Sequence, residues 1–127
     1  MYLLDTDVVV DLFRNYPPAT DWVASQTREE VALPGFVAME ILKGCHDYEE
    51  QRKAEAWLRP FRFYWPDEES CLRAYTVFAT LHLSHGVGIF DALIAHTAIK
   101  YDAQLVTFNA KHYGAIPELS TVEPYKR

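Results

Sequence analysis

Three acidic residues stand beside apolar runs that are far apart in the sequence, and they constrain this chain more than any other feature. Asp5 follows Tyr2-Leu3-Leu4, Glu40 lies within Val37-Ala38-Met39-Glu40-Ile41-Leu42, and Asp91 separates Ile89-Phe90 from Ala92-Leu93-Ile94-Ala95. A carboxylate beside buried surface loses hydration free energy unless a partner compensates it. One such residue is readily explained as a helix cap. Three of them predict a shared cation, and a cation held by carboxylates is typical of phosphate chemistry.

The composition predicts one folded domain over residues 1–127. A chain of 127 residues that is 50% hydrophobic and 14% aromatic can bury its own core, so disorder is not expected. Its apolar runs are shorter than the roughly 20 residues that span a bilayer. Asp5, Asp7 and Asp11 interrupt the first run, so a signal sequence is not expected. The two cysteines do not make a disulfide framework, and we expect a soluble, cytoplasmic protein with no membrane partner.

The net charge of −6 bears on which kinds of nucleic-acid-binding protein this chain can be. A protein that coats nucleic acids usually carries a basic patch and a high pI, so the acidic balance argues against that class. It does not exclude a nuclease, because a bound cation reverses the sign of the charge at a carboxylate site.

Short strands and helices alternate along the chain. Strands are expected at Tyr2–Leu4, Val31–Leu33, Leu105–Thr107 and Ser120–Val122, and Phe61–Trp65 is aromatic and partly alternating. Helices are expected after Asp5-Thr6-Asp7, over Phe36–Lys43 and Glu49–Leu58, from Pro66-Asp67 to about Leu83, and from Asp91 to Tyr101. This alternation predicts an α/β fold in which helices flank a central parallel sheet on both faces.

Parallel sheets place their ligand sites at the carboxyl ends of the strands. Asp5 comes directly after the first strand, and Asn109 follows Leu105–Thr107. Asp91 is expected at a helix N-terminus, where the helix dipole favours an anion. We therefore expect these residues and Glu40 to meet at one end of the sheet.

Each of these residues also has an ordinary structural explanation. Asp5, Asp7 and Asp91 suit helix N-caps, and Asn109 suits a turn after a strand. A single Glu40 in an apolar helix is more often solvated at the helix edge than catalytic. The combination, rather than any one residue, indicates a site.

Four segments together resemble the PIN-domain nucleases and, at this length, the VapC toxins of bacterial and archaeal toxin–antitoxin pairs. They occur in family order and are Tyr2–Leu12, the Glu40 segment ending Leu42-Lys43-Gly44, Asp91–Ala98 and Leu105–Asn109. The resemblance covers essentially the whole chain. It implies a three-layer α/β/α fold, divalent-metal-dependent cleavage of RNA, a homodimer, and inhibition by a cognate antitoxin.

The resemblance also implies roles for individual residues. Asp5, Glu40 and Asp91 match the acidic cluster of the family and would hold Mg²⁺ or Mn²⁺. Asn109 matches a fourth catalytic position, which is Asp in many relatives. His112 stands where relatives often have another Asp, so one or two bound ions remain open alternatives.

Supporting roles are expected for residues next to this cluster. Asp7 and Thr107 lie beside predicted ligands and are expected to orient them by hydrogen bonds. Arg14 and Lys43 lie near the acidic segments and are candidates for contacts with RNA phosphates, although solvated surface charge explains them equally well.

Two alternatives to the endoribonuclease hypothesis remain open at this point. Leu3-Leu4-Asp5-Thr6-Asp7-Val8 also resembles the first motif of haloacid-dehalogenase-type phosphatases, with Asp5 as nucleophile and Asp7 as acid/base. That alternative leaves Glu40 unexplained, and the chain lacks an obvious Gly-Asp-x-x-x-Asp motif. A PIN-like binding module without activity is the second alternative; the neutral Asn109 allows it, and the retained Asp5, Glu40 and Asp91 argue against it.

Overall fold

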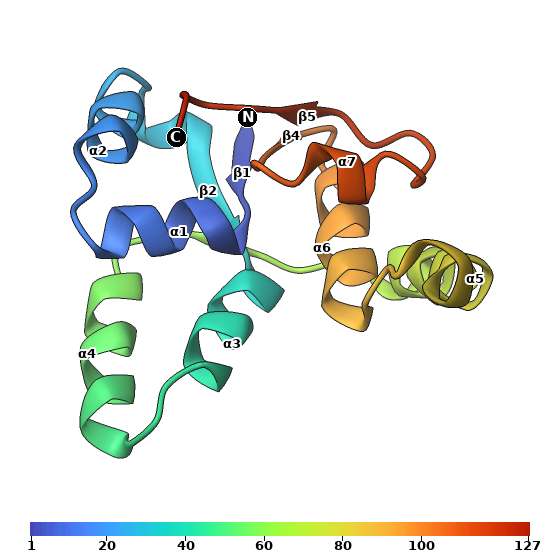
Figure 1. The fold of residues 1–127 in the computed structure, drawn as a ribbon, viewed down its shortest axis with the longest axis horizontal. Helices are drawn as coiled ribbons and strands as arrows, with labels where there is room; N and C mark the ends of the chain where they lie inside the picture. The colour runs from blue at the N-terminus through green and yellow to red at the C-terminus, as the bar shows by residue number, and fades with distance from the viewer.

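A computed structural model describes all residues, 1–127, and shows a five-stranded sheet whose neighbouring strands are all parallel (Figure 1). The spatial order of the strands is β3-β2-β1-β4-β5. Their bounds are β1 Tyr2–Leu4, β2 Val31–Pro34, β3 Phe63–Tyr64, β4 Gln104–Val106 and β5 Thr121–Val122. The predicted parallel α/β architecture is confirmed.

Helices flank the sheet, with α1, α2 and α4 to the left of β1 in Figure 1 and α5, α6 and α7 to its right. Their bounds are α1 Thr6–Phe13, α2 Pro17–Ala24, α3 Gly35–Lys43, α4 Tyr48–Leu58, α5 Glu68–His85, α6 Ile89–Lys100 and α7 Ala110–Tyr113, with a 3₁₀ turn at Arg28–Glu30. None of the helices combines the length and hydrophobicity that a bilayer span requires.

Two predicted boundaries near the acidic residues are wrong by a residue or two. Helix α6 begins at Ile89 rather than at Asp91, because Gly88 takes the N-cap position. Asp91 lies in the first turn, and its carboxylate accepts a hydrogen bond of 2.8 Å from the Gly88 backbone N–H. Strand β4 ends at Val106, so Thr107 lies just beyond it.

Strand β1 lies at the centre of the sheet and is buried on both faces. Leu3 and Leu4 are completely buried, and Leu3 pairs with Ala32 on one side and Leu105 on the other. A strand covered on both faces reads as a continuous apolar run, which is why the opening segment predicts a strand so clearly. The residue after β1 is therefore held at a fixed point in the molecule.

Helix α3, which carries Glu40, follows β2 without an intervening loop, and this junction requires a glycine. A Cβ added to Gly35 would overlap the indole ring of Trp65. That indole is in turn packed edge-on against Phe36, with ring centroids 5.4 Å apart. The close approach of the segment after β3 thus sets the start of α3.

We expect Gly35→Ala to lower the free energy of unfolding by about 1–3 kcal/mol, because the added methyl group overpacks against Trp65. Gly44→Ala is the matched control, since a Cβ there would lie 3.5 Å from the Ile41 carbonyl oxygen, an ordinary van der Waals contact. It should change stability by less than about 0.5 kcal/mol in urea denaturation. Equal effects of the two substitutions would show that the Trp65 contact does not constrain the junction.

Candidate active site

Asp5 lies at the carboxyl end of β1 and is only 6% exposed. Its Oδ1 accepts a 2.8 Å hydrogen bond from the Thr6 backbone N–H, which makes it the N-cap of α1. Its Oδ2 accepts a hydrogen bond of 2.8 Å from the Thr107 hydroxyl, and its Oδ1 accepts a second one, of 3.3 Å, from the Tyr113 hydroxyl. None of the ion pairs of the structure includes Asp5. The carboxylate is fixed by three hydrogen bonds and has no basic partner.

Burial and, to a smaller extent, the charge of the nearby Asp7 carboxylate raise the pKa of Asp5 from its ordinary value of 3.8 to about 6. The hydrogen bonds from Thr107, Thr6 and Tyr113 oppose this shift and do not cancel it. Burial also raises the pKa of Asp7. A pair of carboxylates in this state is stabilised by a cation, whose charge would offset the lost hydration.

Thr107 connects Asp5 to the end of β4. The Thr107 side chain is completely buried, and its hydroxyl oxygen accepts a 3.0 Å hydrogen bond from the Asn109 backbone N–H. The Asp7 carboxylate accepts 3.0 Å from the Phe108 backbone N–H. Side-chain hydrogen bonds therefore join the ends of β1 and β4. Thr107 donates to Asp5 itself, and Asp7 accepts from the segment that follows β4.

Glu40 reaches the same end of the sheet from α3. Its Oε1 accepts a short hydrogen bond from the Thr6 hydroxyl, and Thr6 directly follows Asp5. Thr6 thus donates its backbone N–H to one acidic residue and its hydroxyl to another. Sequence reasoning included Thr6 only as part of the capping segment; its position between two acidic residues of the predicted cluster was not recognised.

Asp91 approaches from the first turn of α6 and contacts His112 on α7. His112 Nε2 lies 2.8 Å from Asp91 Oδ2. Burial raises the pKa of the Tyr113 hydroxyl, and the charges of Asp5, Asp91 and Glu40 raise it further. One buried hydroxyl therefore lies in the field of all three predicted acidic residues. No sequence signal distinguished Tyr113 from an ordinary core aromatic.

The side chains of the acidic cluster carry the oxygen ligands that a divalent cation needs. Asp5, Glu40 and Asp91 offer carboxylate oxygens, which Mg²⁺ and Mn²⁺ prefer, and the buried Asp5 lacks a positive partner. In their present positions no three His, Cys, Asp or Glu side chains are grouped closely enough to hold an ion. Glu40 and Asp91 instead contact Thr6 and His112, so ligation by all three carboxylates requires side-chain movement.

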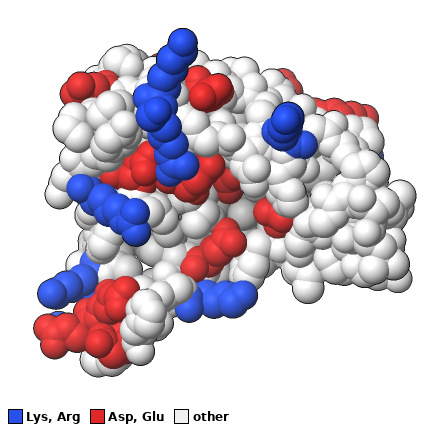
Figure 2. Space-filling model, viewed as in Figure 1, with Lys and Arg blue, Asp and Glu red and all other residues white.

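The remaining predicted site residues differ in how close they lie to this cluster. Asn109 is exposed at the N-cap of α7, and its side chain makes no capping hydrogen bond. Lys43 ends α3 one turn after Glu40, and its Nζ lies 5.5 Å from the ring centroid of Phe90, next to Asp91. Arg14 is the C-cap of α1, so about 12 Å of helix separates it from Asp5. Figure 2 shows acidic side chains gathered in the middle of this face with basic ones around them.

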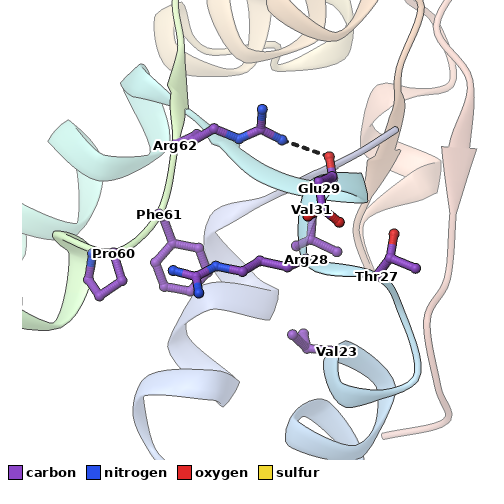
Figure 3. Close-up of a pocket in the computed structure, with 8 residues that line it drawn as sticks. All are labelled: Val23, Thr27, Arg28, Glu29, Val31, Pro60, Phe61 and Arg62. Atoms are coloured by element: carbon purple, nitrogen blue, oxygen red, sulfur yellow. Dashed lines mark hydrogen bonds between the residues drawn. The ribbon is translucent and has the colours of Figure 1, made fainter.

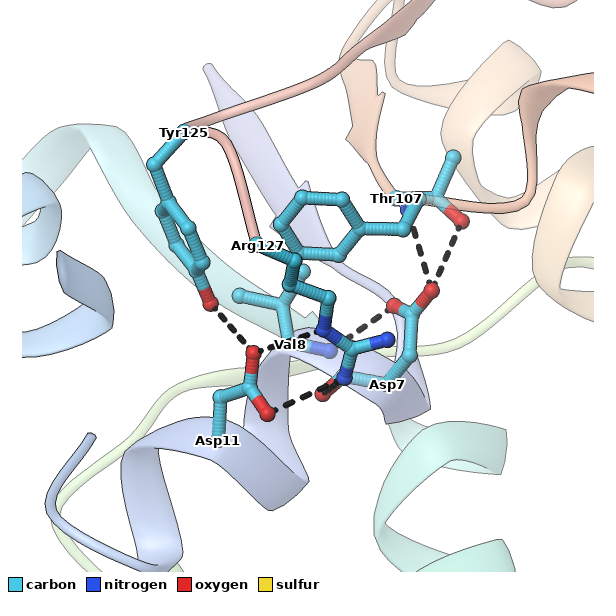
Figure 4. A network of polar contacts seen from close by, with 7 residues as sticks. Asp7, Val8, Asp11, Thr107, Tyr125 and Arg127 are labelled. Carbon is cyan, nitrogen blue, oxygen red and sulfur yellow. Dashed lines mark hydrogen bonds and ion pairs between the residues drawn. The ribbon is translucent and has the colours of Figure 1, made fainter.

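The C-terminal segment adds a network that sequence reasoning missed, because a short basic end predicts a frayed terminus. Asp11 accepts a 2.8 Å hydrogen bond from the Tyr125 hydroxyl and forms an ion pair of 3.0 Å with Arg127 (Figure 4). The Arg127 guanidinium also lies 4.6 Å from the ring centroid of Phe108 and donates to the Asp7 carbonyl over 3.3 Å. The hydrogen bonds that Arg127 donates to the Asp11 carboxylate hold the pKa of Asp11 below its ordinary value. The C-terminal segment therefore contacts both α1 and Phe108, which follows β4.

A cavity of about 510 Å³ lies elsewhere, beside the beginnings of β2 and β3 (Figure 3). Its walls include Val31 at the start of β2 and Phe61 and Arg62 just before β3, and the Arg62 guanidinium donates to the Glu29 carbonyl over 2.7 Å. Strands of a parallel sheet begin at the edge opposite to the one where they end, so this cavity is remote from Asp5. None of the predicted site residues lines it.

In metal-free protein, the Asp5 contribution to stability should be fully present below pH 3.8 and lost as the pH rises to about 6, because the folded state retains a proton that the unfolded chain has released. A pKa raised by about two corresponds to about 3 kcal/mol. Asp5→Asn cannot ionise. Its free energy of unfolding, relative to the parent protein, should therefore rise by up to about 3 kcal/mol from about pH 4 to about pH 7.

The measurement is urea denaturation of both proteins in EDTA at the two pH values. Adding Mn²⁺ at the higher pH should then stabilise the parent protein and not Asp5→Asn, because a cation bound only by the folded state raises its stability. A difference between the two proteins that does not change with pH would contradict a proton-retaining Asp5.

Comparison with known proteins agrees with this architecture. The PIN domain family matches residues 2–115. The chain is 32% identical over 122 residues to Ribonuclease VapC19 of Mycobacterium tuberculosis, which covers 94% of this chain and 97% of that protein. The VapBC-1 structure from nontypeable Haemophilus influenzae superposes with a TM-score of 0.78 at 26% identity and covers 98% of both chains. A toxin–antitoxin complex from Klebsiella pneumoniae, at 23% identity and a TM-score of 0.77, shows the same fold over 100% of each chain.

The family match spans the strands and helices that carry Asp5, Glu40 and Asp91, and the mycobacterial relative aligns along nearly its whole length. Both comparisons agree with the resemblance found in the sequence and with the parallel α/β sheet. The chain belongs to the PIN-domain family and, within it, to the VapC group.

Proposed function

We propose that this chain is a divalent-metal-dependent endoribonuclease that hydrolyses RNA phosphodiester bonds and is the toxin of a toxin–antitoxin pair. The observation that carries the proposal is the set of contacts that links the three carboxylates at the carboxyl ends of the strands. Thr6 donates to both Asp5 and Glu40. Tyr113 donates to Asp5, and the neighbouring His112 contacts Asp91. The mycobacterial relative that matches along the chain is named a ribonuclease. We take residues 1–127 as the single domain that carries the activity.

The residues of the site have separate tasks in this proposal. Asp5, Glu40 and Asp91 hold Mg²⁺ or Mn²⁺, which when bound lowers the pKa of a water molecule and neutralises charge on the phosphate. Thr107 keeps the Asp5 carboxylate in place through its 2.8 Å hydrogen bond, and Asp7 fixes the start of the segment that follows β4. Asn109, exposed at the rim, orients water or a phosphate oxygen by hydrogen bonding.

The antitoxin and a second copy of the chain are the proposed protein partners. The structural relatives from Haemophilus influenzae and Klebsiella pneumoniae are described as VapBC-1 and as a toxin–antitoxin complex. The chain exposes several large apolar side chains that a partner would cover, among them Leu72, Tyr75 and Leu83 on α5. These exposed side chains support a homodimer or an antitoxin complex rather than an isolated monomer.

The family assignment bears on the two alternatives. The PIN domain match and the VapC relatives leave no support for a haloacid-dehalogenase-type phosphatase. Asp5 is also held by three hydrogen-bond donors and 6% exposed, which disfavours its attack on a substrate as a nucleophile. The second alternative, an inactive PIN-like binding module, is distinguished from the nuclease by the cleavage assay below.

We expect the purified protein to cut RNA at discrete positions in Mg²⁺ or Mn²⁺ and not in EDTA, with the ends mapped by sequencing total RNA from its host. Asp5→Asn and Asp91→Asn should each lower the cleavage rate about a hundredfold or more, because bound metal supplies several kcal/mol to the transition state. Asparagine caps a helix as well as aspartate does, so Asp5→Asn preserves the N-cap of α1.

Asp47→Asn is the matched control, since Asp47 caps α4 through a 2.8 Å hydrogen bond from Glu50 N–H and lies outside the acidic cluster. It should cleave at the parental rate. Metal-independent cutting, or no cutting with any of the four proteins, would refute the proposed function and favour the binding module.

Lys43 and Arg14 give a second test, because Lys43 Nζ lies 5.5 Å from the ring centroid of Phe90, the neighbour of Asp91, whereas Arg14 lies at the far end of α1. Lys43→Gln should raise the KM for RNA by roughly threefold to tenfold, through the loss of one charged phosphate contact, and less so at high salt. Arg14→Gln should leave the KM within about twofold, since exposed charges far from the site contribute little. The reverse order would place the RNA path along the outer end of α1.

A further inference from the structure

The contact between His112 and Asp91 is the part of the site that the proposed function does not explain. His112 Nε2 lies 2.8 Å from Asp91 Oδ2, and the same oxygen accepts 2.8 Å from the Gly88 backbone N–H. Both side chains are about one quarter exposed, so solvent reaches them. The imidazole therefore stands beside a predicted ligand oxygen.

Helix α7 and the ring of the adjacent Tyr113 hold His112 in this place. His112 lies in the short helix α7, and its ring packs edge-on against Tyr113 with centroids 5.9 Å apart. Tyr113 is buried and donates its hydroxyl to Asp5. The position of the imidazole is thus tied to the same carboxylate that sits at the end of β1.

We propose that His112 is a metal ligand, and that its imidazole nitrogen together with Asp91 forms a mixed nitrogen–oxygen half-site that favours Mn²⁺ over Mg²⁺. The inference rests on the proposed function, because it assumes that Asp91 binds the cation. It assigns to this chain a nitrogen donor at a position where an oxygen donor is the expectation for its relatives.

The spacing of the two donor atoms agrees with this role. Metal–ligand bonds of about 2.1 Å at right angles place neighbouring donor atoms about 3 Å apart. The observed 2.8 Å between His112 Nε2 and Asp91 Oδ2 is close to that spacing, so a cation can replace the direct contact with little side-chain movement.

The choice of metal follows from the donor set. Mg²⁺ prefers oxygen ligands and retains much of its water, whereas imidazole suits transition metals. Asn109 is neutral and exposed, so it does not supply the further carboxylate that would favour a second hard cation. A site with the carboxylates of Asp5, Glu40 and Asp91 and one imidazole should therefore bind Mn²⁺ more tightly than Mg²⁺.

Electron spin-echo envelope modulation of bound Mn²⁺ tests the proposal without measuring activity, because a nitrogen ligand couples to the manganese electron spin. The experiment uses untagged protein with one equivalent of Mn²⁺. We expect a ¹⁴N modulation in the parent protein that is lost in His112→Gln and His112→Asp. Isothermal titrations should show the Mn²⁺-over-Mg²⁺ affinity ratio falling on the order of tenfold in His112→Asp.

His46→Gln is the matched control. The chain has five histidines, and His46 also lies beside a carboxylate, with its Nδ1 3.4 Å from Glu50 Oε2 on the exposed surface. This variant should keep the ¹⁴N modulation and the affinity ratio of the parent protein. Loss of the modulation in His46→Gln instead of in the His112 variants would overturn the assignment.

The remaining outcomes separate this inference from the proposed function. The parent protein could bind Mn²⁺ without any ¹⁴N modulation, and Asp91→Asn could abolish that binding. This outcome would leave the metal-dependent nuclease intact and reduce His112 to a hydrogen-bond donor. Mn²⁺ binding that Asp91→Asn does not weaken would overturn both. The spectrum of the parent protein decides between these outcomes, so the test does not depend on the stability of any single variant.

Discussion

The structure depends on one buried carboxylate, that of Asp5, held at the end of the central strand. Its desolvation is unfavourable, and three donors from separate parts of the chain, Thr6, Thr107 and Tyr113, offset that penalty in part. Each donor also fixes its own element: Thr6 starts α1, Thr107 follows β4 and Tyr113 ends α7. The arrangement of the site and of this end of the sheet therefore have the same physical cause.

Catalytic and structural explanations of the acidic residues turn out to be compatible. Asp5 is the N-cap of α1, and Asp91 accepts from the backbone N–H that precedes α6. A helix N-terminus carries partial positive charge, so it stabilises an anion whether or not a metal is bound. The capping position thus lets the fold hold a carboxylate near other carboxylates before any cation arrives. Glu40 has no such helix end and relies on the Thr6 hydroxyl.

The sequence predicted the parallel sheet and most helices because those features are local. Continuous apolar runs identify β1 and β2, and capping residues such as Asp67 and Gly44 mark helix ends to within one or two residues. The contacts within the site were harder to predict, since Tyr113 reaches Asp5 and Arg127 reaches Asp11 across more than 100 residues. Such contacts depend on how the elements pack. Packing also separates Lys43 from Arg14, which look equivalent in the sequence.

The acidic end of the sheet is a place where the chain gives up stability for chemistry. Burial raises the pKa of both Asp5 and Asp7, so at neutral pH the folded protein holds charge that an apolar or neutral residue would not introduce. A structural role alone would not require this, because asparagine caps helices equally well and carries no charge. Retaining the carboxylate is explained by a task that needs the charge itself, and binding a divalent cation is such a task. The same reasoning separates Asp5 from Asp47, an exposed cap whose charge carries no burial penalty.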